Sequence, residues 1–98
     1  MVKLIAITRT YNNMKQFKAE FLLKNGKKKN VRFGTKSNYV LNPEKTQQDR
    51  INYLKRHKAL NEDWNNPLTP GSLSRYILWG NSKDININIR DFKKLFNL

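Results

Sequence analysis

Few side chains in this sequence could carry out covalent chemistry. His57 is the only histidine and the chain has no cysteine, which excludes disulfides, thiolate metal sites and cysteine nucleophiles. The adjacent acids Glu62 and Asp63 are too few to hold a metal ion without further oxygen ligands. His57 with Asp63 is the only candidate acid–base pair, and no nucleophile or orienting group accompanies it. We therefore expect no enzymatic activity, no cofactor and no metal site.

A structural role suits these residues better. His57 is expected late in a helix, where an imidazole usually packs against its neighbours or interacts with the helix dipole. Glu62 and Asp63 are expected to form ion pairs, for which the candidate partners are Arg56, Arg75 and His57.

Positive charge is the strongest signal in the sequence. Twenty lysines and arginines against seven acids give a net charge of +13, and a surplus of this size attracts polyanions. The alternative is a basic composition without function, as in proteins from AT-rich genomes. The charge is uneven, because residues 1–36 carry ten basic side chains and one acid, whereas residues 37–98 carry ten and six.

The candidate nucleic-acid contacts surround an expected hairpin and continue on an expected helix. They are Lys24, Lys27, Lys28, Lys29, Arg32, Lys36, Lys55, Arg56 and Lys58. Such clusters neutralise phosphates without reading bases, and the chain has no motif of a sequence-specific DNA-binding protein. Lysines on a strand edge also prevent unwanted strand pairing, which is the alternative role of the hairpin group.

The N-terminal part of the chain predicts three strands. Residues 2–9 are rich in β-branched side chains, residues 16–23 alternate between apolar and polar, and residues 28–33 follow. A turn is expected at residues 11–13, and Asn25-Gly26 predicts a type I′ hairpin turn. One face of these strands must be covered by the helices. This face is expected to contain Phe17, Ala19, Phe21, Leu23, Val31 and Phe33.

A first helix is expected to begin at Pro43, with Asn42 as its cap, and to end near Asn61. Ile51 and Leu54 would lie on its buried stripe. The cations expected to face solvent are Arg50, Lys55, Arg56 and Lys58.

Two shorter helices are expected further along the chain. One begins at Thr69-Pro70, or alternatively with Ser72 as its cap, and ends at Gly80. The other begins after Asn88, because Asp91 three residues later resembles a capping box; the residues before Asn88 are expected to be extended. Its apolar stripe would contain Ile89, Phe92, Leu95 and Phe96.

These elements predict a single α+β domain over residues 1–98. A three-stranded antiparallel β-meander, the basic part at residues 1–36, would pack against two or three short helices in residues 43–98, with a Pro/Gly corner between them. No apolar segment approaches the roughly 20 residues of a membrane span, and the first residues do not form a signal peptide. An intracellular location is therefore expected, without secretion.

Several short motifs follow one another in the second part of the chain. They are Phe33-Gly34, YLKRHK (Tyr53–Lys58), NEDW (Asn61–Trp64), TPG (Thr69–Gly71), LSRYILW (Leu73–Trp79) and the final NIRDFKKLFNL. In this order they resemble a family of small basic proteins of uncharacterised function encoded by nucleocytoplasmic large DNA viruses, the giant viruses. The resemblance covers residues 33–98. It implies a viral origin and a location in the virion, the host cytoplasm or the virus factory, but it implies no reaction.

The chain departs from the family pattern in two places. Asn38-Tyr39-Val40 stands where the family has Asp-Tyr-Thr, and Glu62 is not preceded by the arginine of the family. A role that depends on that acid or that arginine is therefore not expected. Trp64 and Trp79 match the pattern at a spacing that suits buried anchors, with base stacking as the alternative for Trp64.

Charge and resemblance together predict a non-enzymatic protein that binds nucleic acid without sequence specificity, DNA rather than RNA. Its expected role is to condense or anchor the genome in the virion. The alternative is a minor capsid or other structural protein that contacts virion proteins, for example by adding a strand at the hairpin edge. Neither function involves a small-molecule substrate.

Overall fold

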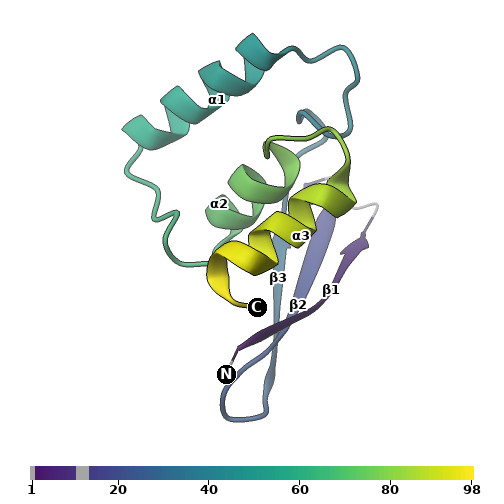
Figure 1. The fold of residues 1–98 in the computed structure, drawn as a ribbon, viewed down its shortest axis with the longest axis vertical. Coiled ribbons are helices and arrows are strands. Elements are labelled where there is room, and N and C mark those ends of the chain that lie inside the picture. Colours follow the sequence, from purple (N-terminus) through teal and green to yellow (C-terminus); the bar gives the residue numbers. More distant parts are fainter. Residues whose placement is uncertain (1, 11–13) are drawn as a thin grey trace.

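The sheet and helices of the predicted α+β fold are present. The computed structural model describes residues 2–10 and 14–98, so the predicted turn at residues 11–13 lies outside the described residues. The elements are β1 (Lys3–Arg9), β2 (Phe17–Leu22), β3 (Lys28–Phe33), α1 (Gln47–Ala59), α2 (Pro70–Leu73), the π-helical turn η1 (Ser74–Leu78) and α3 (Ile85–Phe96). The strands form one antiparallel sheet in the order β1-β2-β3. Helix α2 contacts β3, and α3 packs on η1 (Figure 1).

The apolar face of the sheet is the predicted one. Phe17, Ala19 and Phe21 of β2 are buried, as are Val31 and Phe33 of β3. Helix residues complete the core on this face because an apolar sheet face must be covered. They are Tyr53, Leu73, Ile77, Leu78, Trp79 and Phe92.

The hairpin turn between β2 and β3 is not the predicted type I′ turn. The amide of Leu23 donates to the Lys27 carbonyl at 2.8 Å, and the amide of Gly26 donates to the Leu23 carbonyl at 3.0 Å. Within this turn only Gly26 has a positive φ, 82°, whereas a type I′ turn needs two such residues. Asn25 instead accepts the Lys27 amide through Oδ1 at 3.0 Å, so its side chain stabilises a three-residue loop.

Helix α1 begins at Gln47 instead of Pro43, because Thr46 and not Asn42 is its cap. The Thr46 hydroxyl accepts the Asp49 amide at 3.2 Å, and the Asp49 carboxylate accepts the Thr46 amide at 2.8 Å. These hydrogen bonds hold the pKa of the Asp49 carboxyl below its usual value. Asn42 accepts the amide of Asn38 in the preceding turn.

The buried face of α1 also differs from the prediction. Arg50 and Tyr53 are buried, whereas Ile51 is 37% exposed. Arg50 Nε donates to the carbonyl oxygens of Trp79 at 3.0 Å and Gly80 at 2.8 Å. These carbonyls follow the end of η1, where a helix leaves acceptors without partners. The side of α1 that carries Arg50 is therefore buried, because the carbonyl groups of Trp79 and Gly80 need a hydrogen-bond donor.

Helix α2 begins at the predicted residues and continues directly into the wider π-helical turn η1. Thr69 Oγ1 accepts the amide of Ser72 at 3.2 Å, and Pro70 is the first helical residue. In the following turn the amide of Trp79 donates to the Ser74 carbonyl at 3.0 Å. This bond reaches back five residues instead of the four of a regular α-helix.

Helix α3 begins at Ile85, earlier than predicted, with Asp84 as its cap. Asn88, the predicted cap, is buried inside the helix. Its side-chain amide donates to the carbonyls of Ile77 at 2.9 Å and Ser82 at 2.7 Å. The residue that resembled a capping signal therefore ties α3 to the end of η1.

The predicted stripe of α3 is only partly buried. Phe92 is in the core, Ile89 and Phe96 pack against it, and Leu95 is 59% exposed. Gly80 allows α3 to lie this close, since a Cβ there would lie 2.7 Å from Cγ of Asn88 on α3.

Candidate nucleic-acid interface and a polar cleft

The predicted nucleic-acid contacts are all exposed, but they form two separate groups. Five of them lie on the β2–β3 hairpin, with Lys36 just beyond it, and three lie on α1. Figure 1 shows the hairpin turn and α1 at opposite ends of the longest axis, along which the molecule measures 40 Å. The structure therefore does not bring the nine residues into a single patch.

The sheet face turned away from the core gathers further cations. Strand register and alternation place these residues on it because Phe17, Ala19 and Phe21 point the other way. We call this surface the open sheet face. It consists of Lys3, Ala6, Thr8, Lys18, Glu20, Leu22, Lys28, Asn30 and Arg32.

Two cations oppose each other directly on the open sheet face. Lys18 pairs across strands with Arg32, and like charges in such positions destabilise a sheet. Glu20, the one acid among the residues of this face, lies opposite Asn30 and Ala6 and not opposite a cation. A bound polyanion would relieve the repulsion between Lys18 and Arg32.

Lys3 and Lys18 were not among the predicted contacts. The alternation of residues 16–23 is the signal that identifies Lys18, since it places that side chain opposite the apolar face. Lys3 could be assigned to the same face only from the register of β1, which shifts between Leu4 and Ala6.

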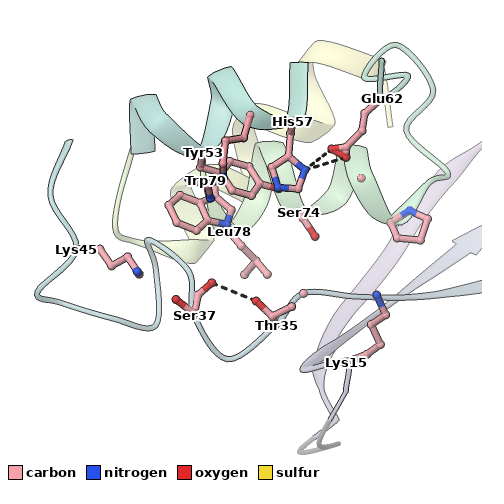
Figure 2. Close-up of a pocket in the computed structure, with 14 residues that line it drawn as sticks. Lys15, Thr35, Ser37, Lys45, Tyr53, His57, Glu62, Ser74, Leu78 and Trp79 are labelled. Atoms are coloured by element: carbon pink, nitrogen blue, oxygen red, sulfur yellow. Dashed lines mark hydrogen bonds and ion pairs between the residues drawn. The ribbon is translucent and has the colours of Figure 1, made fainter. Parts of the chain in front are cut away.

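A polar cleft of about 510 Å³ lies between α1, the connection after β3, and the α2–η1 helix (Figure 2). Its cations come from three different segments of the chain, and hydroxyl groups lie between them. These residues are Lys15, Lys45, Arg56, Thr35, Ser37 and Ser74.

An imidazole–carboxylate pair lines this cleft. His57 Nδ1 lies 2.6 Å and 3.1 Å from the two carboxylate oxygens of Glu62. The His57 ring packs on Tyr53 at 4.1 Å between centroids, and Tyr53 stacks on Trp79 at 4.1 Å with an interplanar angle of 2°. Glu62, and not Asp63, is thus the partner of His57. Because the carboxylate accepts the Nδ1 proton, Nε2 is the ring nitrogen left for another partner.

Gly71 provides the space that the Glu62 carboxylate occupies. A Cβ at Gly71 would lie 3.1 Å from Glu62 Oε2. We expect Gly71→Ala to displace this carboxylate and lengthen its bond to His57, with stability changed by no more than about 1 kcal/mol because alanine favours the helix. Nitrogen chemical shifts of the His57 ring would report the change. Unaltered shifts would show that the chain accommodates the methyl group without moving Glu62.

Arg75 does not form the predicted ion pair with Glu62 or Asp63 in the described structure. Its guanidinium lies over the rings of Tyr76 at 4.4 Å and Trp64 at 5.1 Å. Burial lowers the pKa of Arg75. Trp64 therefore contacts a half-buried cation. This contact fits a structural role for Trp64 better than a ring that is free to stack on bases.

In the part of the chain that the structure describes, no cluster of three or more His, Cys, Asp or Glu side chains could hold a metal ion, and none of the helices has the length and apolar character needed to cross a bilayer. No protein-family model, curated protein or solved structure matches the chain. The resemblance to the giant-virus family therefore stays a prediction, and the functional argument depends on geometry and charge.

Proposed function

We propose that this protein binds nucleic acid without sequence specificity through the open sheet face and the adjoining hairpin turn. The opposition of Lys18 and Arg32 across the strands is the observation that carries the proposal. The repulsion between these two cations lowers the stability of the free protein, and a bound anion would remove that repulsion. Lys24, Lys27 and Lys28 extend the same positive surface to the end of the hairpin.

The chemistry of the open sheet face favours contact with phosphates. It presents lysines and an arginine but no aromatic side chain among its residues. Proteins that bind single strands on a sheet use aromatic rings as stacking platforms. The face therefore suits the backbone of a duplex. Duplex DNA is the expected form because the family that the sequence resembles belongs to DNA viruses.

The two basic groups suit a role in condensing or anchoring a genome within a virion. The hairpin turn, which carries Lys24 and Lys27, and α1, which carries Lys55 and Lys58, lie at opposite ends of a molecule 40 Å long (Figure 1). One molecule could thus contact two duplex segments at once, which holds segments together without any base-specific contact.

Removal of the opposed cations should weaken binding. We expect the double variant Lys18→Gln/Arg32→Gln to lower the slope of log affinity against log salt by about two, because each lost phosphate contact removes roughly 0.9. The measurement is a salt titration of binding to random-sequence duplex DNA. The same variant should be more stable than the parent, by about 0.2–1 kcal/mol.

The matched control is Lys93→Gln/Lys94→Gln, which removes the same charge from exposed positions of α3. An equal fall in slope for both double variants would mean that net charge alone attracts DNA. If the parent protein fails to bind duplex even at low salt, the proposal is wrong and the structural protein-contact role becomes the better one.

Bridging is tested separately from binding. We expect Lys55→Gln/Lys58→Gln to leave affinity for a short duplex within about twofold, since the hairpin group is intact, but to raise the protein concentration needed to pellet long DNA severalfold. Equal losses in both assays would show that α1 and the hairpin contact one duplex segment together.

A further inference from the structure

We infer that the polar cleft is a separate binding site for a nucleoside phosphate, with Arg56, His57 and Ser74 around the phosphate and Lys45 at the other end of the cleft (Figure 2). This inference does not depend on the proposed function, because the cleft lies on the core side of the sheet, away from the open sheet face. Residues of five motifs noted in the sequence line it, among them Gly34, Glu62 and Trp79.

The cations that line the cleft outnumber its carboxylates. Lys45 and Arg56 line it, against one carboxylate, that of Glu62. Glu62 is already bound to His57 at 2.6 Å. A phosphomonoester, with a charge of about −1.5 to −2 at neutral pH, would complement this lining, and Arg56 could bind two of its oxygens at once.

Further hydrogen-bonding groups lie between the cations. Glu62 holds Nδ1 of His57, so Nε2 is the ring nitrogen available to a ligand, and it donates to a phosphate oxygen only when the ring carries both protons. Figure 2 shows Ser74 below the imidazole on the same side of the cleft. Thr35 is different, because its hydroxyl already donates to the Ser37 carbonyl at 3.1 Å. Ser74 is therefore the neutral donor that we assign to the phosphate, and His57 is its neighbour on the same side.

The groups around the cleft are held in place before a ligand arrives. The stack of His57, Tyr53 and Trp79 fixes the imidazole. Lys83 Nζ donates to the Lys45 carbonyl and fixes the connection that carries this lysine. Fixed partners lose little conformational entropy on binding and so favour affinity.

The size and the remaining lining indicate that the phosphate is attached to a nucleoside. About 510 Å³ lies within the range of small-molecule sites, about 300–1,000 Å³, and exceeds what a bare phosphate needs. Pro70 provides exposed apolar surface beside the cations, and the buried side chains of Trp79 and Leu78 lie behind the lining. Gly34 lets the loop approach this wall, since a Cβ there would lie 2.4 Å from Leu78 Cδ1. A free nucleotide and the 5′-phosphorylated end of a strand present the same group.

The test compares ligands that differ only in the phosphate. Calorimetric titration of the full chain with adenosine 5′-monophosphate should give saturable binding at least about tenfold tighter than with adenosine. A 5′-phosphorylated and a 5′-hydroxyl oligonucleotide of one sequence distinguish the two sources. Preference for either phosphorylated ligand supports the site, and the preferred one identifies the source. Equal binding with and without phosphate, for both pairs, overturns it.

Variants locate the site. Arg56→Gln should weaken binding of the preferred phosphorylated ligand about tenfold, while the matched control Lys93→Gln should leave it unchanged. An equal effect of the control would overturn the assignment to this cleft. Lys18→Gln/Arg32→Gln should retain phosphate-dependent binding, so that a failure of the proposed function and a failure of this inference give different results.

Discussion

Trp79→Ala is expected to lower the free energy of unfolding by about 3–5 kcal/mol, the cost of removing a large aromatic side chain from a core. Trp79 is 6% exposed and lies parallel to Tyr53 at 4.1 Å between ring centroids. The stacked pair also separates the apolar core from the polar cleft, and burial raises the pKa of Tyr53 far above its usual value. Urea denaturation followed by circular dichroism would measure the loss.

Trp79→Phe is the matched variant, because it retains an aromatic ring that can stack on Tyr53. We expect it to lose less than half as much stability as the alanine variant. A Trp79→Ala protein of normal stability that no longer binds nucleic acid would contradict this prediction. It would make Trp79 a stacking platform for bases.

Arg50→Met is expected to destabilise the protein by about 2–4 kcal/mol. Arg50 Nε donates to the carbonyls of Trp79 and Gly80, and its Nη2 donates to Asn81 Oδ1 at 2.8 Å. Methionine keeps much of the buried aliphatic volume but leaves these acceptors without donors, at about 1–3 kcal/mol for a buried group. Thermal and urea denaturation would both report the change.

Arg50→Lys tests the reason for this loss. Lysine keeps the charge but not the planar fork that reaches several acceptors, so we expect an intermediate stability. Arg90→Met is the control for arginine loss at an exposed position and should stay within about 0.5 kcal/mol of the parent. An Arg50→Met protein as stable as the parent would show that water satisfies the carbonyls.

The strands could be predicted from the sequence because the signals that form them are local. Alternation in residues 16–23 places Phe17 and Phe21 on one face whatever the rest of the chain does, and both are buried. The first residue of each helix was harder to predict, since several nearby side chains could accept a backbone amide as the cap. Thr46, and not Asn42, caps α1 because Asp49 completes a capping box with it.

The buried polar residues could not be predicted, because their partners are distant in the chain. Arg50 bonds to the carbonyl of Gly80, thirty positions later, and no local pattern marks such a partner. Basic residue type identified the nine exposed cations of the predicted interface, but it also placed Arg50 at the surface, whereas the structure buries that side chain. Their division into two groups, and the cleft at His57, depend on where α1 packs.

The wide turn η1 restricts how the length of this chain can change during evolution. A turn of this kind takes up one extra residue within a single turn, so the residues after it keep the phase they would have in a regular helix one residue shorter. Deleting one residue within Ser74–Leu78 should therefore restore regular bonding while Trp79 still faces Tyr53 and the Gly80 carbonyl still faces Arg50. Inserting a residue in a regular part of this segment would instead rotate all later residues by about 100°. Descendants of this chain should therefore lose one residue here more readily than they gain one.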